Sequence, residues 1–118
     1  MHIQVSPVAK PRMTQRDKWK QRPVVMKYRA YKDELRQALS YKAIMMEMWL
    51  IFVVEMPQSW SKKKKAKMSG QAHQQRPDID NLVKGFLDAL LEEDSAVDEI
   101  HAKKVWGEKG SIYYGKKY

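Results

Sequence analysis

The sequence contains no cysteine among its 118 residues. This absence excludes a disulfide framework, a thiolate nucleophile and any metal site built on cysteine sulfur. Proteins that dispense with disulfides are compatible with a reducing compartment, and we expect a cytoplasmic protein. Histidine is also scarce, with three residues in all, and His73 has no neighbour at the spacing of a metal-ligand pair.

Long hydrophobic runs are missing as well. The most apolar stretch, from Met48 to Val54, is far shorter than the ~18 residues that a membrane-spanning helix needs. The segment from Met1 to Pro11 lacks the apolar core of a signal peptide. A hydrophobic content of 43% without internal repeats predicts one globular domain over residues 1–118. We expect neither a membrane partner nor a small-molecule substrate.

Negative charge is scarce and unevenly distributed. The formal net charge is +9, and residues 10–36 carry ten lysines or arginines against three acids. Residues 61–76 carry six basic residues and no acid, whereas residues 78–99 hold eight of the fourteen acids, opposed only by Lys84. A strongly basic chain indicates a polyanionic partner, most commonly nucleic acid. The segregated acids indicate a local site of different chemistry.

The basic residues predict contacts with DNA phosphates in two segments. One is a loop over residues 6–22, and the other is a short basic helix that begins after Ser59 or Ser61 and ends at Gly70. The alternative is that both are merely solvated charged surfaces. The candidate DNA-binding residues are Lys10, Arg12, Arg16, Lys18, Lys62, Lys63, Lys64 and Arg76.

Hydrophobic periodicity predicts the remaining elements, which are strands over 2–5, 43–55, 100–106 and 111–114 and helices over 24–41 and 79–91. Residues 43–55 are expected to form the central strand, 71–75 a polar linker, and 107–110 the turn of a hairpin. The first helix is expected to bury Val24, Tyr28, Tyr31, Leu35 and Leu39. Together these elements predict an α/β (α+β) fold in which about two main helices pack on a small mixed sheet.

The helix over 79–91 has the clearest pattern in the chain. Its apolar residues recur at helical spacing and form one continuous face, with Gly85 as a tolerated weak point in its interior. This apolar face consists of Ile79, Leu82, Val83, Phe86, Leu87, Leu90 and Leu91. The polar residues of the same helix must therefore lie together on the opposite, open side.

Acidic residues and one lysine gather at the start of this helix. Asp78 and Asp80 are two apart, so on an extended lead-in their carboxylates would project from one side of the backbone. Lys84 and Asp88 follow at intervals of four residues, and Asp94 can return to the same side when the chain reverses. Oxygen ligands without histidine or cysteine favour Mg²⁺ or Mn²⁺ over Zn²⁺. The alternative is that an aspartate only caps the helix and Lys84 only forms salt bridges along it.

These residues also resemble a known family, the RusA Holliday-junction resolvases. The resemblance is carried by Arg76-Pro77-Asp78-Ile79-Asp80-Asn81-Leu82-Val83-Lys84, by Leu87-Asp88-Ala89-Leu90, by Asp94-Ser95 and by Lys103-Lys104-Val105-Trp106-Gly107. It implies a small RusA-like α/β homodimer that resolves four-way DNA junctions by paired symmetric nicks with Mg²⁺. It further implies that Asp78, Asp80 and Asp94 are the metal ligands and that Lys84 is the catalytic lysine. Members of this family are often carried by phages and prophages.

The sequence departs from the family pattern near the third acid. The connection after Leu90 is shorter than in many relatives, and the expected pair of aspartates reads Glu93-Asp94. Glu93 and Asp98 are therefore alternatives to Asp94 as the third carboxylate. Two other functions stay open on the sequence alone: a non-catalytic DNA-binding protein, and a nuclease that acts on flaps or other branched DNA.

Overall fold

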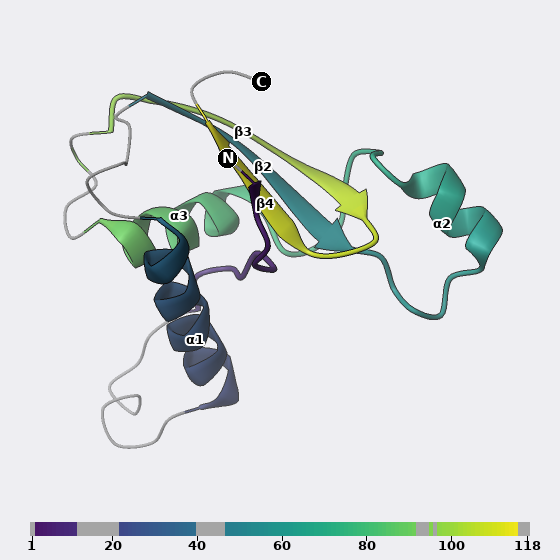
Figure 1. Cartoon of the computed structure of the whole chain (residues 1–118), viewed down its shortest axis with the longest axis horizontal. Helices are drawn as coiled ribbons and strands as arrows, with labels where there is room; N and C mark the ends of the chain where they lie inside the picture. The colour runs from purple at the N-terminus through teal and green to yellow at the C-terminus, as the bar shows by residue number, and fades with distance from the viewer. Residues whose placement is uncertain (1, 12–21, 40–46, 92–94, 96, 116–118) are drawn as a thin grey trace.

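A four-stranded mixed sheet forms the centre of the molecule (Figure 1). The computed structural model describes residues 2–11, 22–39, 47–91, 95 and 97–115. The strands are β1 (His2–Ile3), β2 (Glu47–Glu55), β3 (Glu99–Gly107) and β4 (Ser111–Gly115), in the spatial order β1-β4-β2-β3. β2 runs parallel to β3 and antiparallel to β4, which confirms the mixed sheet.

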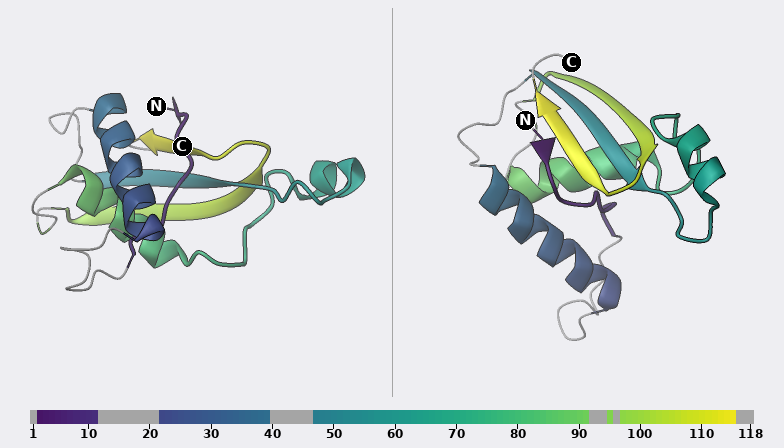
Figure 2. Two further views of the ribbon diagram at one scale, coloured as in Figure 1. Left: turned by 90° about the horizontal axis from the view of Figure 1, so that it is seen from below. Right: turned by 45° about the vertical axis from the view of Figure 1, so that its right-hand side comes forward.

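Two of the three helices in the described part of the chain build the body of the molecule. α1 (Pro23–Ala38) packs against α3 (Ile79–Leu90), and α3 in turn packs against the sheet. α2 (Lys62–Met68) stands apart at the far end of β2 and β3, as both views in Figure 2 show. No helix in the described ranges is both long and apolar enough to cross a membrane.

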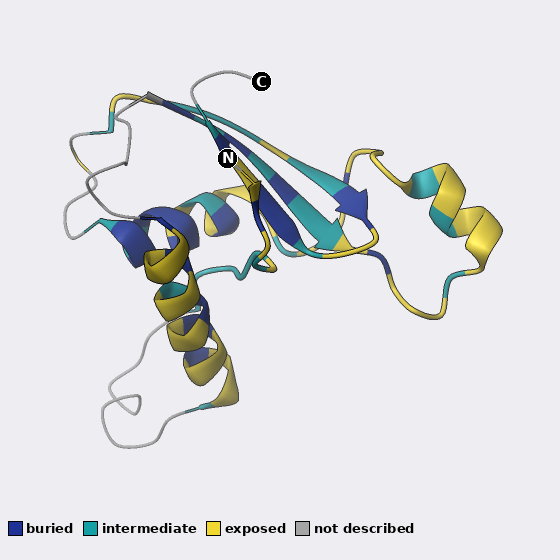
Figure 3. Cartoon of the chain, viewed as in Figure 1, coloured by how far each residue is buried: buried dark blue, intermediate teal, exposed yellow. Residues whose placement is uncertain are grey.

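The core lies between β2 and α3. Met48, Leu50 and Phe52 are 0% exposed on one face of β2, and the ring of Phe52 meets that of Phe86 edge-on at 6.3 Å between centroids. On the opposite face, Trp49, Ile51 and Val53 are only half-buried. Figure 3 shows the buried and intermediate colours along β2. The central strand predicted from the sequence is confirmed, and residues 43–46 of that prediction lie outside the described residues.

The predicted hairpin around residues 107–110 is wrong. β2 lies between β3 and β4, so the turn carries the chain across the end of β2 instead of joining two paired strands. A central strand has hydrogen-bonding groups on both edges, and β3 and β4 each satisfy one of them. A short turn between two strand-like segments is a local signal that does not reveal this third partner.

Two details of the first predicted helix are also corrected. Val24 is 45% exposed, whereas Val25 is 0% exposed and starts the buried stripe that continues to Tyr28. The spacing of three residues from Val25 to Tyr28 and Tyr31 keeps one face toward α3. The helix ends at Ala38, because Leu39 adopts an extended conformation with φ −127° and ψ 121°. Tyr28, Tyr31, Leu35 and Leu39 are buried as predicted.

Candidate active site

Asp78 and Asp80 lie at the beginning of α3, and both are exposed. Asp78 is the N-cap residue with φ −69° and ψ 145°, yet its side chain makes no capping hydrogen bond. Asp80 already belongs to the first helical turn. The extended lead-in expected to carry both carboxylates is therefore wrong for Asp80, because the helix begins one residue earlier, at Ile79. The alternative that the Asp78 side chain only caps the helix is therefore wrong.

The two carboxylates open onto neighbouring surfaces. Asp78 lines a cavity of about 480 Å³ together with Arg76, Pro77 and Asn81. Asp80 lines another of about 460 Å³, which it shares with Lys84 and with the apolar residues Ile79, Val83, Leu87, Ile100 and Ala102. The start of α3 thus presents one acid beside an arginine and the other beside a lysine, on a surface open to a large ligand.

Asp88 is placed between two cations. Its Oδ2 atom lies 3.7 Å from Nζ of Lys84 and 3.5 Å from Nζ of Lys10. The side chain of Lys84 is 60% exposed, whereas those of Lys10 and Asp88 are 25% and 26% exposed. The ammonium of Lys10 also lies 4.8 Å from the ring centre of Tyr28. Lys10, predicted to bind DNA, is therefore held against α1 and α3, and Lys84 is the more accessible cation.

Residues 8–10, which follow β1 in the chain, run directly against α3 at Gly85. A Cβ atom on Gly85 would lie 2.7 Å from the carbonyl oxygen of Val8 and 3.0 Å from the backbone nitrogen of Lys10. That same nitrogen donates a 3.2 Å hydrogen bond to the carbonyl of Asn81. The interpretation of Gly85 as a mere weak point in the helix is corrected, because only a residue without a side chain lets the two segments touch.

The segment between α2 and α3 pairs with the outer edge of β3. Gly70 donates its backbone N–H to Trp106 at 2.8 Å, Trp106 donates to Gln71 at 3.0 Å, and His73 donates to Lys104 at 3.0 Å. The polar linker predicted over 71–75 is confirmed as an irregular and mostly exposed connection, and it is also held to β3 by backbone hydrogen bonds. β3 is an edge strand whose free backbone groups need partners, and this segment supplies them. His73 is 4% exposed, and its ring lies 4.3 Å from that of Trp106.

Lys104 extends this attachment to the residue that precedes Asp78. Its Nζ atom donates hydrogen bonds to the carbonyls of Gln75 at 2.7 Å and Pro77 at 2.8 Å. Lys104 was expected only as part of the family motif over residues 103–107, without a role of its own. A signal was present, since Lys104 shares the parity of Ile100 and Ala102, the β3 residues that line the cavity beside α3. A charged residue at a position of that parity requires a polar partner.

The basic helix α2 is anchored by tryptophan rings. The Ser61 hydroxyl accepts a 3.2 Å hydrogen bond from the backbone of Lys64, which confirms the predicted cap, and Gly70 ends the segment with φ 81°. Trp60 lies 4.8 Å from Trp106 between ring centres, and the ammonium of Lys64 lies 4.3 Å from the Trp60 ring centre. The lysines at the start of α2 are exposed. Arg12, Arg16 and Lys18 lie outside the described residues.

The donor atoms at the start of α3 fit a hard divalent cation. Asp78 and Asp80 supply carboxylate oxygens, which Mg²⁺ and Mn²⁺ prefer. Within the described ranges, no three histidine or acidic side chains lie close enough to form a complete metal site. Asp94 and Glu93 are outside those ranges, and Asp98 is described and exposed. A third carboxylate from the connection after α3 therefore stays a prediction.

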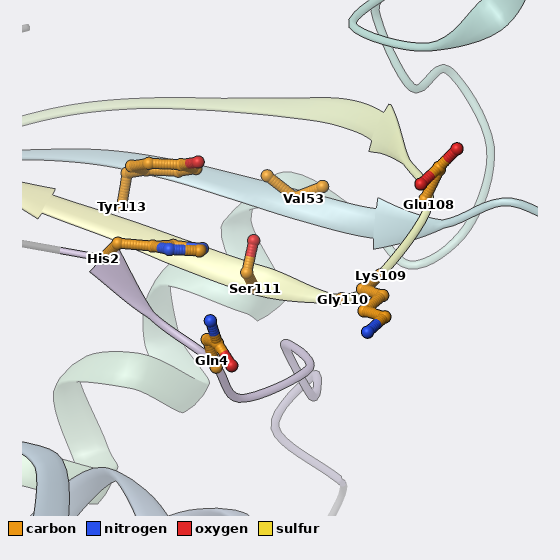
Figure 4. A pocket seen from close by; sticks show the side chains of 8 residues that line it. All are labelled: His2, Gln4, Val53, Glu108, Lys109, Gly110, Ser111 and Tyr113. Carbon is orange, nitrogen blue, oxygen red and sulfur yellow. The ribbon is translucent and has the colours of Figure 1, made fainter. Parts of the chain in front are cut away.

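A cavity of about 400 Å³ on the other face of the sheet has different chemistry (Figure 4). It includes the stacked rings of His2 and Tyr113, whose centres are 4.3 Å apart. Among the described residues that line it, Glu108 supplies the single carboxylate. Lys109 lies beside Glu108 in this cavity, but the paired acids are missing, so the amino-terminal end of α3 is the candidate active site.

Comparison with known proteins gives one match, to a protein family. A family model described as "Endodeoxyribonuclease RusA" matches residues 4–113 of the chain. No curated protein and no solved structure shows significant similarity to it. The match spans β2, β3, the first part of β4 and all three helices of the described structure, and it leaves out β1.

Proposed function

The chain belongs to the RusA endodeoxyribonuclease family, and from this premise we propose that it resolves four-way (Holliday) DNA junctions by paired, symmetric, Mg²⁺-dependent nicks. Membership of the family makes the protein an endodeoxyribonuclease that acts on DNA junctions. The metal, the symmetry of the nicks, the homodimer and the cytoplasmic location belong to the proposal.

One observation carries the proposal: the start of α3 exposes two carboxylates and a lysine. The Asp78 side chain is not used in capping the helix, and Asp80 and Lys84 line the same open cavity. Carboxylates alone would repel a phosphate. A metal cation between the carboxylates and the phosphate would turn this repulsion into attraction. We assign Asp78, Asp80 and Asp94 as the residues that would hold it.

A bound Mg²⁺ or Mn²⁺ supplies positive charge against the scissile phosphate and makes water a better nucleophile at neutral pH. The chain's own contribution is to place the phosphate beside Lys84. The Lys84 side chain is 60% exposed and its Nζ atom is 3.7 Å from Asp88, so it can turn toward a phosphate. Its charge would then stabilise the additional negative charge of the transition state.

DNA approaches an acidic site only if other residues attract its backbone. Lys62, Lys63 and Lys64 are exposed on α2, which stands apart from the body of the molecule, and Arg76 lies in the cavity beside Asp78. Replacing the counterions on phosphates is the physical source of this attraction. We assign α2 and Arg76 to the grip on the junction arms. Arg12, Arg16 and Lys18 are proposed to join them from the segment outside the described residues.

A homodimer follows from the symmetry of the substrate. A four-way junction offers two equivalent strands, and a protein with two-fold symmetry can present one active site to each. Two coordinated nicks then separate the junction into two duplexes, each with one nick, whereas a single nick would leave the junction joined.

The decisive experiment uses an end-labelled four-way junction, a flap and a matched linear duplex, each incubated with the protein in Mg²⁺ or in EDTA. The proposal expects symmetric nicks in the junction with Mg²⁺ and none with EDTA or with the duplex. Equal or faster cutting of the flap would transfer the function to other branched DNA. Binding without cutting under every condition would identify a non-catalytic DNA-binding protein and overturn the proposal.

A further inference from the structure

Lys104 uses its ammonium group to hold a neighbouring backbone segment. Nζ donates to the carbonyl oxygens of Gln75 at 2.7 Å and Pro77 at 2.8 Å. Hydrogen bonds from a charged donor are about twice as strong as those between neutral groups. The backbone carbonyl of Lys104 also accepts from His73 at 3.0 Å, so both its main chain and its side chain hold the same segment.

The second of these carbonyls is joined directly to Asp78. The oxygen of Pro77 belongs to the planar peptide group that includes the nitrogen of Asp78, so fixing this oxygen fixes the plane from which Asp78 extends. On its other side, the carbonyl of Asp78 accepts the N–H of Leu82 at 3.1 Å as α3 begins. Asp78 is therefore held by Lys104 on one side and by the first turn of α3 on the other. Its carboxylate is not used in capping.

The neighbouring lysine provides a contrast. Lys103 is exposed, whereas Lys104 is half-buried. Successive residues of a strand point to opposite faces, so Lys103 faces away from α3. The two residues have the same charge and the same strand, and they differ in what the ammonium touches. Removing either lysine takes one positive charge from the protein and weakens its attraction for DNA accordingly. Of the two, Lys104 is the one that contacts the segment that carries Asp78.

We propose that Lys104 is a positioning residue for the divalent-cation site, which it serves by fixing the backbone of Asp78 relative to Asp80 on α3. This inference rests on the proposed metal-dependent function. Its loss leaves both carboxylates in the protein and loosens the placement of one. Cation affinity then falls while the grip on the DNA changes no more than the loss of any single lysine would cause.

The test compares Lys104→Met with Lys103→Met in the full chain. Mn²⁺ binding to the DNA-free protein is measured from the electron paramagnetic resonance signal of the free ion. Mg²⁺ titrations of junction nicking give the half-saturating concentration, and junction binding is measured in EDTA. We expect Lys104→Met to weaken Mn²⁺ binding and raise the half-saturating Mg²⁺ concentration by at least about tenfold, as when a residue that orients a metal ligand is removed. Lys103→Met should leave both near wild type.

Junction binding in EDTA should change to the same small extent in both variants. Equal Mn²⁺ affinity in the two variants would overturn the inference. A selective loss of junction binding in Lys104→Met would make Lys104 a DNA contact instead. Should thermal unfolding show that Lys104→Met does not fold, Lys104→Gln replaces it, because its shorter neutral amide cannot reach both carbonyls. Wild-type Mn²⁺ affinity in that variant would also refute the inference.

Measurements on the wild-type protein distinguish a failure of the metal-dependent function from a failure of the role of Lys104. If it binds no Mn²⁺ and nicks junctions equally in EDTA, the metal-dependent function is wrong and the role of Lys104 falls with it. If it requires the metal and the two methionine variants behave alike, only the role of Lys104 is wrong.

Discussion

The hydroxyl of Tyr28 on α1 donates a 2.9 Å hydrogen bond to the carbonyl of Gly85 on α3. Both residues are buried, and the Gly85 carbonyl lies in the middle of the helix that carries the candidate site. On the next part of the same interface, Arg36 donates through Nε to the carbonyl of Ala89 at 2.8 Å. Side chains of α1 therefore hold the backbone of α3 by hydrogen bonds as well as packing against its apolar side chains.

Tyr28→Phe should destabilise the protein by about 1 kcal/mol, because the variant keeps the ring and loses the hydrogen bond. Urea unfolding at neutral pH measures this free energy. Tyr113→Phe is the control, since it removes a hydroxyl from an exposed ring on the opposite face. Equal stabilities of the two variants would contradict a contribution from the bond to Gly85.

The same residue predicts how stability changes in alkaline solution. Burial, and secondly the charge of Asp88, raise the pKa of Tyr28 from 10.0 to about 12. Between these values the unfolded chain has lost the proton and the folded protein still holds it, so the free energy of unfolding decreases as the pH rises from 10 to about 12. Tyr28→Phe should lack this part of the decrease, and a decrease identical to that of wild type would disprove the assignment.

Gly85→Ala should destabilise the protein although alanine is the better helix former. The new Cβ would meet backbone atoms of Val8 and Lys10 at 2.7 and 3.0 Å, and backbone cannot move aside as a flexible side chain can. We expect a net loss of about 1–3 kcal/mol in the free energy of unfolding, the usual range for overpacking. Gly115→Ala is the control, because nothing lies within 4 Å of a Cβ at that position. A Gly85→Ala variant as stable as the control would show that the close contact between residues 8–10 and α3 does not contribute to stability.

Asp80→Asn should abolish nicking of a four-way junction while binding survives or becomes tighter. The change removes one negative charge, which would both hold the metal and repel the DNA. Gel-based nicking assays in Mg²⁺ and binding assays in EDTA separate the two effects. Asp33→Asn, an exposed position on α1, makes the same chemical change away from the site. Wild-type cleavage rates in Asp80→Asn would refute the metal assignment.

The double variant Lys62→Ala and Lys63→Ala should weaken junction binding and reduce its salt dependence. Each lost phosphate contact lowers the slope of log affinity against log salt concentration by about one unit, so the pair should lower it by about two. Lys64 is left unchanged because its ammonium lies over the Trp60 ring. Lys103→Ala controls for the loss of charge alone. An unchanged slope would make α2 a solvated surface.

His73 predicts a loss of stability in weak acid. Burial, and secondly the charge of Lys104, lower its pKa from 6.5. Below 6.5 the unfolded chain binds a proton that the folded protein does not, so the free energy of unfolding should fall as the pH drops through 6.5. His73→Phe keeps a ring against Trp106 and cannot titrate. The acid-induced loss of stability should therefore be smaller in this variant than in wild type, and His2→Phe serves as the exposed control.

Local patterns carried the parts of the fold that could be predicted. The apolar face of α3 follows from helical spacing, and its buried members include Leu82, Phe86 and Leu90. The cap of α2 at Ser61 follows from side-chain chemistry next to the helix. The identity of the family followed from the motif around Asp78, Asp80 and Lys84, and the match over residues 4–113 confirms it.

Predictions failed where a residue's role depends on a segment distant in the sequence. Residues 107–110 have the composition of a hairpin turn, but the position of β2 between β3 and β4 decides their path. Glycine has a low helix propensity, so Gly85 looks unfavourable in α3, but its contact with Val8 gives it a packing role. Neither partner is within reach of a local pattern.

The sequence by itself determined the main helices and strands, the basic character and the family, and it suggested the acids and lysine of the proposed site, because periodicity and residue chemistry act over a few positions. The tertiary structure alone decided that β3 and β4 flank the central strand β2, that Asp88 lies between Lys10 and Lys84, and that Lys104 holds the peptide before Asp78. These relationships join residues far apart in the chain, and the packing of α3 on the sheet brings them together.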